Sequence, residues 1–201
     1  MNPHFLFNVL LTIQIKAKRS GNETIYKMVS KLSALLRASI YTNNVDRITV
    51  GEELEYTEFY LYLQKMRFED RFFYKIIVED EELKKCIIPK FVIEPIVENA
   101  VIHGIENIEN EGLIRIVLKK IGKDLIVTVQ DNGVGFDVRE YLDSLEQAKN
   151  GSSREKIGLK NVDLRLRHIY GEEYQIKIES EINTGTTIYI KIPVEEREEN
   201  V

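Results

Sequence analysis

Apolar positions in the first 40 residues recur at the spacing of an amphipathic helix. Residues 6–17 and 25–39 each follow the i, i+3, i+4 pattern of one helical face, and Gly21 and Asn22 interrupt the pattern between them. This arrangement predicts two helices in an antiparallel hairpin. Because a single hairpin buries its apolar stripe poorly, we expect two copies to pair as a four-helix bundle, so that the chain is a homodimer.

Beyond the hairpin, the pattern predicts a connector, a further helix and then strands. Residues 42–50 read as a connector, and residues 52–66 are apolar on more than one side, which predicts a helix packed into the second half of the chain. Strands are expected where apolar and polar positions alternate, and helices where the helical spacing returns. The predicted strands cover 72–79, 84–88, 113–120, 125–130, 175–180 and 186–192, and the predicted helices cover 90–104 and 159–168.

Proline and polar segments refine this picture. A proline inside a helix costs about 3 kcal/mol, so the helix within 90–104 is expected to begin near Glu94, with Pro95 in its first turn. Residues 137–157 predict an irregular polar loop, either a lid over a ligand or an ordinary surface loop. Strands that do not alternate strictly with helices predict an α+β fold with helices on one face of a mixed sheet.

Composition excludes several classes of protein. The chain is 43% hydrophobic and 30% charged, which is typical of a globular protein rather than a disordered one. Its net charge of −5 disfavours a general nucleic-acid binder, which needs a basic face. The single cysteine, Cys86, has no internal disulfide partner and favours a reducing compartment. Met1 is followed by N-P-H-F without a basic region, so we expect no signal peptide here, and no apolar run approaches the roughly 20 residues of a membrane-spanning helix.

Two short motifs offer groups that bind a nucleotide. In D-N-G-V-G-F, Asp131 ends a strand and presents an acceptor suited to an amino group such as that of adenine, and Gly133 and Gly135 permit positive φ or close approach. A plain tight turn explains the same letters. In E-N-A-V-I-H-G, Asn99 and His103 share one helix face, and an asparagine oxygen suits Mg²⁺. The alternative is that the end of this motif caps a helix.

Two further motifs offer a phosphate site and a nucleophile. In K-I-G-L-K-N-V, Gly158 lies just before a helix, whose free N–H groups attract phosphate, although a glycine at a helix start is also common. In N-P-H-F-L-F-N, Asn8 lies one turn after His4 on the same helix face. A neutral imidazole is a competent nucleophile toward phosphorus, although a lone histidine is more often structural or simply exposed.

These four motifs, in this order, resemble the sensor histidine kinases of the autolysin-regulator and sugar-sensor type, and the later three resemble the wider gyrase, Hsp90, histidine kinase and MutL superfamily. The resemblance covers essentially the whole chain. It implies a helical dimerisation and phosphotransfer region with its connecting helix over 1–66, and a two-layer α/β sandwich that binds ATP over 67–201. The implied activity is ATP-dependent phosphorylation of His4 and transfer of the phosphoryl group to an aspartate of a response regulator.

The resemblance also assigns roles residue by residue. His4 matches the phosphoacceptor, with Asn8 to orient its ring or a hydrolytic water, and Asn99 matches the Mg²⁺ ligand. Asp131 matches the adenine-binding aspartate. The other ATP-binding positions that it implies are Glu98, His103, Gly133, Gly135, Gly158, Leu159, Asn161 and Thr186.

This sequence departs from the family pattern in three places. Lys156 stands where relatives carry a further glycine before the glycine-leucine pair, and Phe5 stands where many histidine kinases carry an acidic residue. Relatives also have a longer helix ahead of N-P-H, so we expect a cytoplasmic piece of a longer chain whose upstream part reaches the membrane. Lys156 and the shortened first helix leave open a catalytically inactive nucleotide-binding dimer switch. An ATPase of the gyrase or Hsp90 kind and a serine kinase of the anti-sigma type fit less well, because neither explains the first 66 residues.

Overall fold

The chain forms two compact units, Met1–Asp46 and Arg47–Val201. A computed structural model describes residues 3–41, 46–147 and 157–194. The helix expected over 52–66 belongs to the second unit, as its apolar character indicated. The functional division of the chain at residue 66 stays a prediction.

The first unit is the predicted helical hairpin. Its helices are α1 (Pro3–Arg19) and α2 (Glu23–Tyr41). Gly21 ends α1 in the left-handed region at φ 69°, and the side chain of Asn22 caps α2 by accepting from the N–H of Ile25 at 3.0 Å. Gln14 of α1 donates to the hydroxyl of Ser30 of α2 at 2.9 Å, which joins the two helices.

The hairpin leaves much of its apolar surface uncovered. Leu10 and Ala17 are buried. The large apolar side chains that remain exposed in its described part are Phe5, Val9, Leu11, Ile13, Ile15 and Ile25. Several large apolar side chains exposed together on a two-helix element are typical of an interaction surface.

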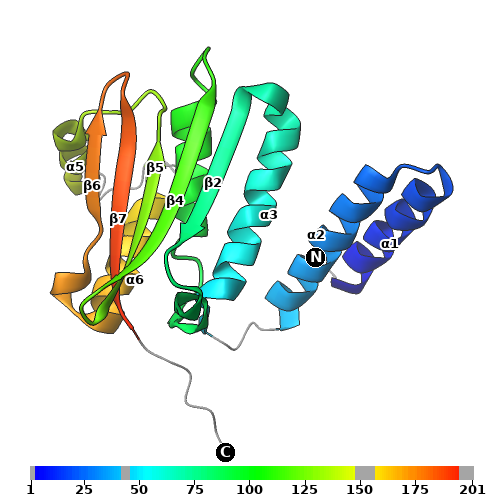
Figure 1. Ribbon diagram of the computed structural model, residues 1–201, viewed down its shortest axis with the longest axis horizontal. Helices are drawn as coiled ribbons and strands as arrows, with labels where there is room; N and C mark the ends of the chain where they lie inside the picture. The colour runs from blue at the N-terminus through cyan, green and yellow to red at the C-terminus, as the bar shows by residue number, and fades with distance from the viewer. Residues whose placement is uncertain (1–2, 42–45, 148–156, 195–201) are drawn as a thin grey trace, which may run out of the picture. The chain divides into compact units, whose positions relative to one another are not determined.

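The second unit is built on a five-stranded mixed sheet in the order β2-β4-β5-β7-β6 (Figure 1). Its strands are β2 (Phe72–Val78), β4 (Gly112–Ile121), β5 (Asp124–Asp131), β6 (Lys177–Glu181) and β7 (Gly185–Pro193). Strands β2 and β4 are parallel, and the other neighbours are antiparallel. The predicted mixed sheet is confirmed.

Helices cover one face of this sheet. They are α3 (Val50–Phe68), α4 (Glu94–Asn99), the π-helix η3 (Ala100–Ile105), α5 (Val138–Gln147) and α6 (Ile157–Tyr170). Along β4, Ile114, Ile116 and Leu118 are fully buried while Arg115 between them is exposed. The buried side chains share one core with those of α4 and α6, and α6 lies behind the sheet in Figure 1. The sequence-based expectation of two layers is confirmed.

The predictions for two segments, the connector over 42–50 and the strand over 84–88, are wrong in part. Residues 47–49, expected within a connector, form β1 (Arg47–Thr49), which pairs antiparallel with β3 (Ile87–Pro89). The strand expected over 84–88 is shorter, because a 3₁₀-helix, η2 (Glu81–Lys85), occupies its start. Asp80 caps that helix by accepting from the N–H of Glu82, a local hydrogen bond that competes with strand formation.

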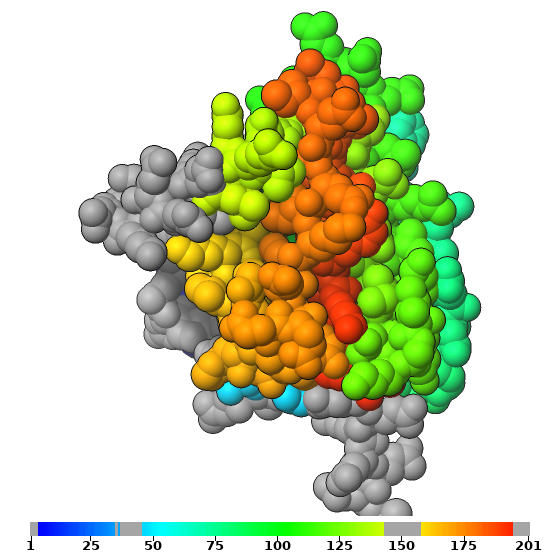
Figure 2. All heavy atoms as spheres, turned by 90° about the vertical axis from the view of Figure 1, so that its left-hand side faces the viewer, coloured from blue at the N-terminus to red at the C-terminus, as the bar shows by residue number. Residues whose placement is uncertain are grey.

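The polar segment 137–157 is not irregular throughout. Residues 138–147 form α5, because Asp137 accepts hydrogen bonds from the N–H groups of Arg139 and Glu140 and so caps the helix. Helix α5 packs beside the outer strand β6 (Figure 2). Residues 148–156 of the segment expected to be a lid or a surface loop lie outside the described residues.

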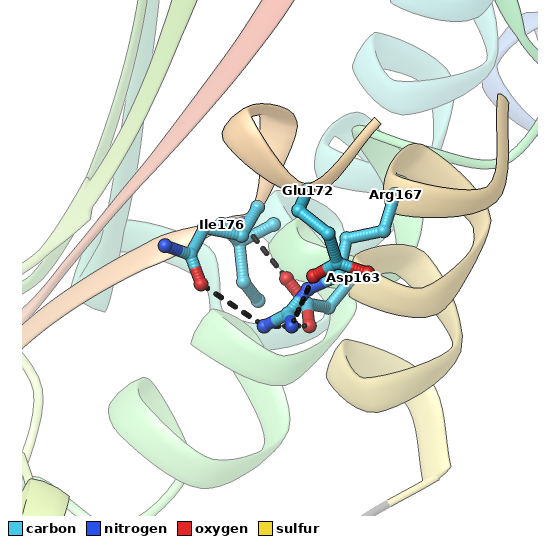
Figure 3. Close-up of polar contacts among 5 residues, drawn as sticks. Asp163, Arg167, Glu172 and Ile176 are labelled. Carbon is cyan, nitrogen blue, oxygen red and sulfur yellow. Dashed lines mark hydrogen bonds and ion pairs between the residues drawn. The ribbon is translucent and has the colours of Figure 1, made fainter. Parts of the chain in front are cut away.

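A polar cluster ties the end of α6 to the chain that leads into β6 (Figure 3). Arg167 contacts Asp163 at 2.9 Å and both Glu172 and Gln175 at 3.0 Å. Asp163 also accepts from the N–H of Ile176 at 2.9 Å. These bonds fix α6 against β6, after Gly171 has turned the chain at φ 107°.

Within the described ranges, no helix is long and apolar enough to cross a bilayer.

Candidate functional site

The second unit contains a cavity of about 320 Å³. It lies between α4, η3, the start of α6, the last residues of β5 and the first residues of β7. Its lining is mostly apolar, with a few polar groups that converge on it, which is the usual composition of a small-molecule site. The lining residues are Ile96, Asn99, Ala100, His103, Gly104, Val129, Asp131, Gly135, Phe136, Tyr141, Leu159, Thr186 and Ile188.

Asp131 is the buried charge in this cavity. It ends β5, opposite Thr186 of β7, and its side chain lies on the buried face of the sheet. One carboxylate oxygen, Oδ1, accepts from the N–H of Gly133 at 2.9 Å and from the N–H of Thr186 at 3.2 Å. Both bonds use Oδ1, so the carboxylate is held in place while Oδ2 takes no part in either.

Burial raises the pKa of Asp131 to about 6, because desolvation of the carboxylate outweighs the two backbone hydrogen bonds that lower it. Perturbed carboxyl groups in a cavity are typical of functional sites. The pKa of Glu94, at the start of α4, rises to about 7 through burial and through the neighbouring charges of Glu98 and Glu53.

Asn99 and His103 reach the cavity from one continuous turn of chain. The predicted late helix start is confirmed, with Glu94 as the first residue of α4 and Pro95 in its first turn. Asn99 ends α4 and donates from Nδ2 to the carbonyl of Pro95 at 2.7 Å. The following π-helix carries His103 and Gly104. Single π-turns inside α-helices are frequent at functional sites.

Glycines let the backbone close tightly beside Asp131. A Cβ on Gly133 would lie 2.3 Å from the Cα of Gly104, and a Cβ on Gly104 would lie 2.9 Å from Oδ1 of Asp131. Gly135 has φ 57°, and a Cβ there would lie 2.0 Å from the carbonyl of Glu181. The absence of a side chain at Gly133 and Gly135 therefore allows a close approach to protein backbone, and Gly135 also lines the cavity.

The start of α6 lies next to Asn99. Gly158 is in its first turn, and a Cβ on Gly158 would lie 3.3 Å from Nδ2 of Asn99. Leu159 is buried and lines the cavity. The free N–H groups of a helix N-terminus therefore face the same region as Asn99.

Six of the residues predicted for nucleotide binding line the cavity: Asn99, His103, Asp131, Gly135, Leu159 and Thr186. Gly133 and Gly158 pack directly behind it. The remaining two, Glu98 and Asn161, are exposed and do not line it. Lys156, the departure beside Gly158, lies outside the described residues.

Sequence reasoning missed two aromatic residues of the lining. The rings of Phe136 and Tyr141 lie 5.1 Å apart at 53° and form one wall. Phe136 closes the D-N-G-V-G-F motif, so its position was a usable signal. Tyr141 carried none, because its segment reads as a polar loop. The N–H of Phe136 donates to Ser180, whose hydroxyl contacts that of Thr186 at 2.9 Å.

The first unit holds the candidate nucleophile. His4 and Asn8 are exposed on α1, and the amide Nδ2 of Asn8 lies 3.3 Å from Nδ1 of His4. This confirms that the two side chains share a face. Because amide orientation and imidazole tautomer are assigned from hydrogen bonding, the amide oxygen of Asn8 can take the same position and accept from a protonated Nδ1.

Comparison with solved structures supports this fold. The chain is similar to the histidine kinase domain of the Erythrobacter litoralis EL346 blue-light activated histidine kinase, with a TM-score of 0.54 and 14% identity over 97% of this chain and 99% of that one. It is also similar to the catalytic domain of histidine kinase ThkA, with a TM-score of 0.56 and 15% identity over 74% of this chain and 96% of that one.

Curated relatives are closer in sequence. Sensor histidine kinase YesM of Bacillus subtilis is 38% identical over 96% of this chain and 32% of its own length. Sensor histidine kinase YpdA of Escherichia coli is 33% identical over 96% of this chain and 33% of its own length. Sensor histidine kinase/phosphatase LytS of Staphylococcus aureus is 31% identical over 99% of this chain and 34% of its own length. The chain thus spans about a third of the length of these relatives.

Two family models cover nearly the whole chain. One, described as histidine kinase, matches residues 1–72. The other, described as histidine kinase-, DNA gyrase B-, and HSP90-like ATPase, matches residues 88–196 and therefore contains the cavity. The chain belongs to the histidine kinase family, and its second unit carries that family's ATPase fold.

Proposed function

We propose that this chain is the kinase core of a two-component sensor. It phosphorylates itself on His4 with ATP and passes the phosphoryl group to an aspartate of a response-regulator receiver domain. The observation that carries this proposal is the buried Asp131 in a mostly apolar cavity of about 320 Å³, in a chain that belongs to the histidine kinase family.

The cavity suits adenine. Its apolar walls, among them Val129 and Ile188, offer apolar contacts to a purine ring. Asp131 accepts from two backbone N–H groups through Oδ1, so Oδ2 is the oxygen that would receive the exocyclic amino group. A carboxylate held rigidly in this way discriminates against a base that presents a carbonyl oxygen at the same position.

The phosphates would lie toward Asn99 and the start of α6. The bond from Asn99 to Pro95 uses the amide nitrogen, so Oδ1 is the atom that suits Mg²⁺. Within the described ranges, no group of three or more His, Cys, Asp or Glu residues is placed to hold a metal ion. When bound with ATP, Mg²⁺ supplies charge neutralisation at the phosphates.

His4 is the proposed nucleophile. One imidazole nitrogen forms a bond to the γ-phosphorus as the bond between that phosphorus and the β–γ bridging oxygen breaks, and ADP leaves. With Asn8 accepting from Nδ1–H, the unprotonated Nε2 would carry the attacking lone pair. Many histidine kinases carry an acidic residue at the position of Phe5. Asn8 would take over part of its role, because its amide orients the imidazole ring of His4 without adding charge.

Asn8 also suits a phosphatase reaction. The relative LytS of Staphylococcus aureus is a kinase/phosphatase. After transfer, an amide one helical turn from the unphosphorylated His4 can hold a water molecule that attacks the aspartyl phosphate of a docked regulator, with the aspartate carboxylate as leaving group and inorganic phosphate as product. We therefore assign Asn8 a role in dephosphorylation of the partner as well.

The hairpin is the proposed dimer and docking element. Its exposed apolar side chains on α1 are expected to pack in a four-helix bundle with a second copy. We place the chain in the cytoplasm, with any membrane attachment supplied by an upstream segment and with no nucleic-acid partner.

Titration with ATP labelled on the γ-phosphate separates the proposal from its alternatives. A histidine kinase transfers label to itself. A non-catalytic nucleotide switch binds ATP without transfer, and an ATPase of the gyrase or Hsp90 kind releases labelled phosphate without retaining it. Retention of label on the protein is the expected result.

A further inference from the structure

Glu53 is a buried carboxylate that the proposed mechanism does not use. It lies in the first turns of α3 and is only 1% exposed. An isolated charge is costly to bury, and a buried carboxylate persists only where hydrogen bonds compensate it. The partners of this one lie about 40 residues further along the chain, at the start of α4.

Four successive backbone N–H groups converge on this carboxylate. Phe91 donates to Oε2 at 3.0 Å. The other oxygen, Oε1, accepts from Val92 at 2.9 Å, from Ile93 at 3.0 Å and from Glu94 at 3.4 Å. Such a run of N–H groups forms a concave anion-binding nest. Here the anion is supplied by another helix of the same unit.

Helix α4 depends on this external cap. Its N-cap residue, Ile93, makes no side-chain cap hydrogen bond, so its first N–H groups need other acceptors. Phe91 is held at φ 58°, which is unfavourable for a residue with a Cβ. Its side chain is 46% exposed, so burial of the ring does not explain that conformation. The hydrogen bond from the N–H of Phe91 to Glu53 accounts for it.

The start of α3 is also where the chain enters the second unit. The first unit ends at Asp46, and β1 leads directly into α3. Thr49 caps α3 through a capping box with Glu52, and the N–H of Val50 donates to the carbonyl of Cys86 at 2.8 Å. A displacement of the entering segment therefore acts first on β1 and the start of α3.

The other end of α4 reaches the cavity. Asn99, the proposed Mg²⁺ ligand, is its last residue and lies less than two turns from the capped start. Ile96 and Asn99 both line the cavity. A short helix fixed at its start by Glu53 moves as one piece, so its cap controls where Asn99 lies.

We propose that Glu53 is a positioning residue that couples α3 to the nucleotide cavity: its carboxylate fixes the start of α4, so a displacement of the segment entering the second unit changes the position of Asn99 and the affinity for ATP. The inference rests on the proposed function of that cavity. It adds a mechanical link between the hairpin side of the chain and nucleotide binding.

The test compares Glu53→Gln with Glu55→Gln in the 201-residue chain. Both remove one carboxylate from α3, but Glu55 is exposed. Binding of the analogue adenylyl-imidodiphosphate is measured together with amide hydrogen exchange. Glu53→Gln is expected to weaken binding roughly tenfold, to raise KM for ATP more than it lowers kcat, and to speed exchange mainly in 91–99. Glu55→Gln is expected to match wild type.

A second measurement needs no variant. Coupling is reciprocal, so saturating analogue is expected to slow exchange in wild type both at 91–99 and at the start of α3, in peptides covering 47–57. Unchanged exchange at 47–57, or unchanged binding by folded Glu53→Gln, would overturn the inference alone. Failure of wild type to bind the analogue at all would overturn the proposed function and this inference with it.

Discussion

At the scale of single residues, the chemistry of the cavity depends on how far Asp131 is removed from water. Its role as an adenine acceptor was inferred from a turn-like motif and a family resemblance. Its burial, its raised pKa and its use of Oδ1 for two backbone bonds follow from strand pairing with β7, which no local pattern shows.

Replacement of Asp131 by asparagine is expected to stabilise the nucleotide-free chain above pH 6. A carboxyl whose pKa rises on folding favours the folded state at low pH and loses that advantage as pH rises toward about 6. Asparagine can keep both bonds to Oδ1 without a charge. A rise in pKa from 3.8 to about 6 corresponds to at most about 3 kcal/mol.

Thermal unfolding across pH checks this expectation. The difference in Tm between Asp131→Asn and wild type should be largest at pH 7–8 and should shrink between pH 6 and pH 4. The same variant should bind the ATP analogue at least about tenfold more weakly, because its amide nitrogen cannot accept from adenine. A Tm difference that grows as the pH falls would contradict the assignment.

Asn8 gives a second prediction at this scale. Asn8→Asp keeps an oxygen that accepts from Nδ1–H of His4 but loses the amide donor. It should retain autophosphorylation within a few-fold and lose phosphatase activity toward a phosphorylated regulator, whereas Asn8→Ala should lower both by about tenfold or more. Rates of label gain and of label loss from the regulator measure the two activities. An alanine variant with both intact would remove Asn8 from the mechanism.

At the scale of elements, periodicity predicted most helices and strands correctly. The hairpin, the late start at Glu94 and the paired strands β4 and β5 follow from patterns within a short stretch of sequence. Two exceptions have local hydrogen bonds as their cause: Asp137 caps α5, and Asp80 caps η2. A third exception is the short pairing of β1 with β3, which joins residues 38 to 42 positions apart and therefore leaves no signal in the local periodicity.

Close packing of η3 on the D-N-G turn gives an element-scale prediction. Gly133→Ala should push the π-helix away from Asp131, because the new Cβ would lie 2.3 Å from the Cα of Gly104. We expect nucleotide binding to fall by more than tenfold and the stability to drop by several kcal/mol. Gly122→Ala is the control: its Cβ meets nothing within 4 Å, and it bears only the cost of a residue at φ 61°. Equal effects of the two variants would argue against this packing.

At the scale of the whole molecule, the chain divides its chemistry between two units. The proposed nucleophile, His4, belongs to the hairpin, and the cavity lies wholly within the second unit. The resemblance of ordered motifs predicted this division. Sequence patterns could not supply the shape of the cavity, because its walls come from segments up to about 90 residues apart.

Separation of the units is therefore testable. The fragment 47–201 has its own sheet and core, and we expect it to fold and to bind the ATP analogue within about threefold of the whole chain. It should be monomeric by light scattering, whereas the whole chain should dimerise through the exposed apolar residues of α1. A dimeric fragment would place the dimer interface in the second unit.

The central claim is that ATP bound in the second unit phosphorylates His4. The most direct test incubates the wild-type chain and His4→Ala with Mg-ATP labelled on the γ-phosphate, with analogue binding measured on both. We expect label on wild type alone, labile in acid and stable in alkali as a phosphohistidine is. Equal label on both proteins would move the acceptor elsewhere, and binding without label on wild type would contradict kinase activity in this chain.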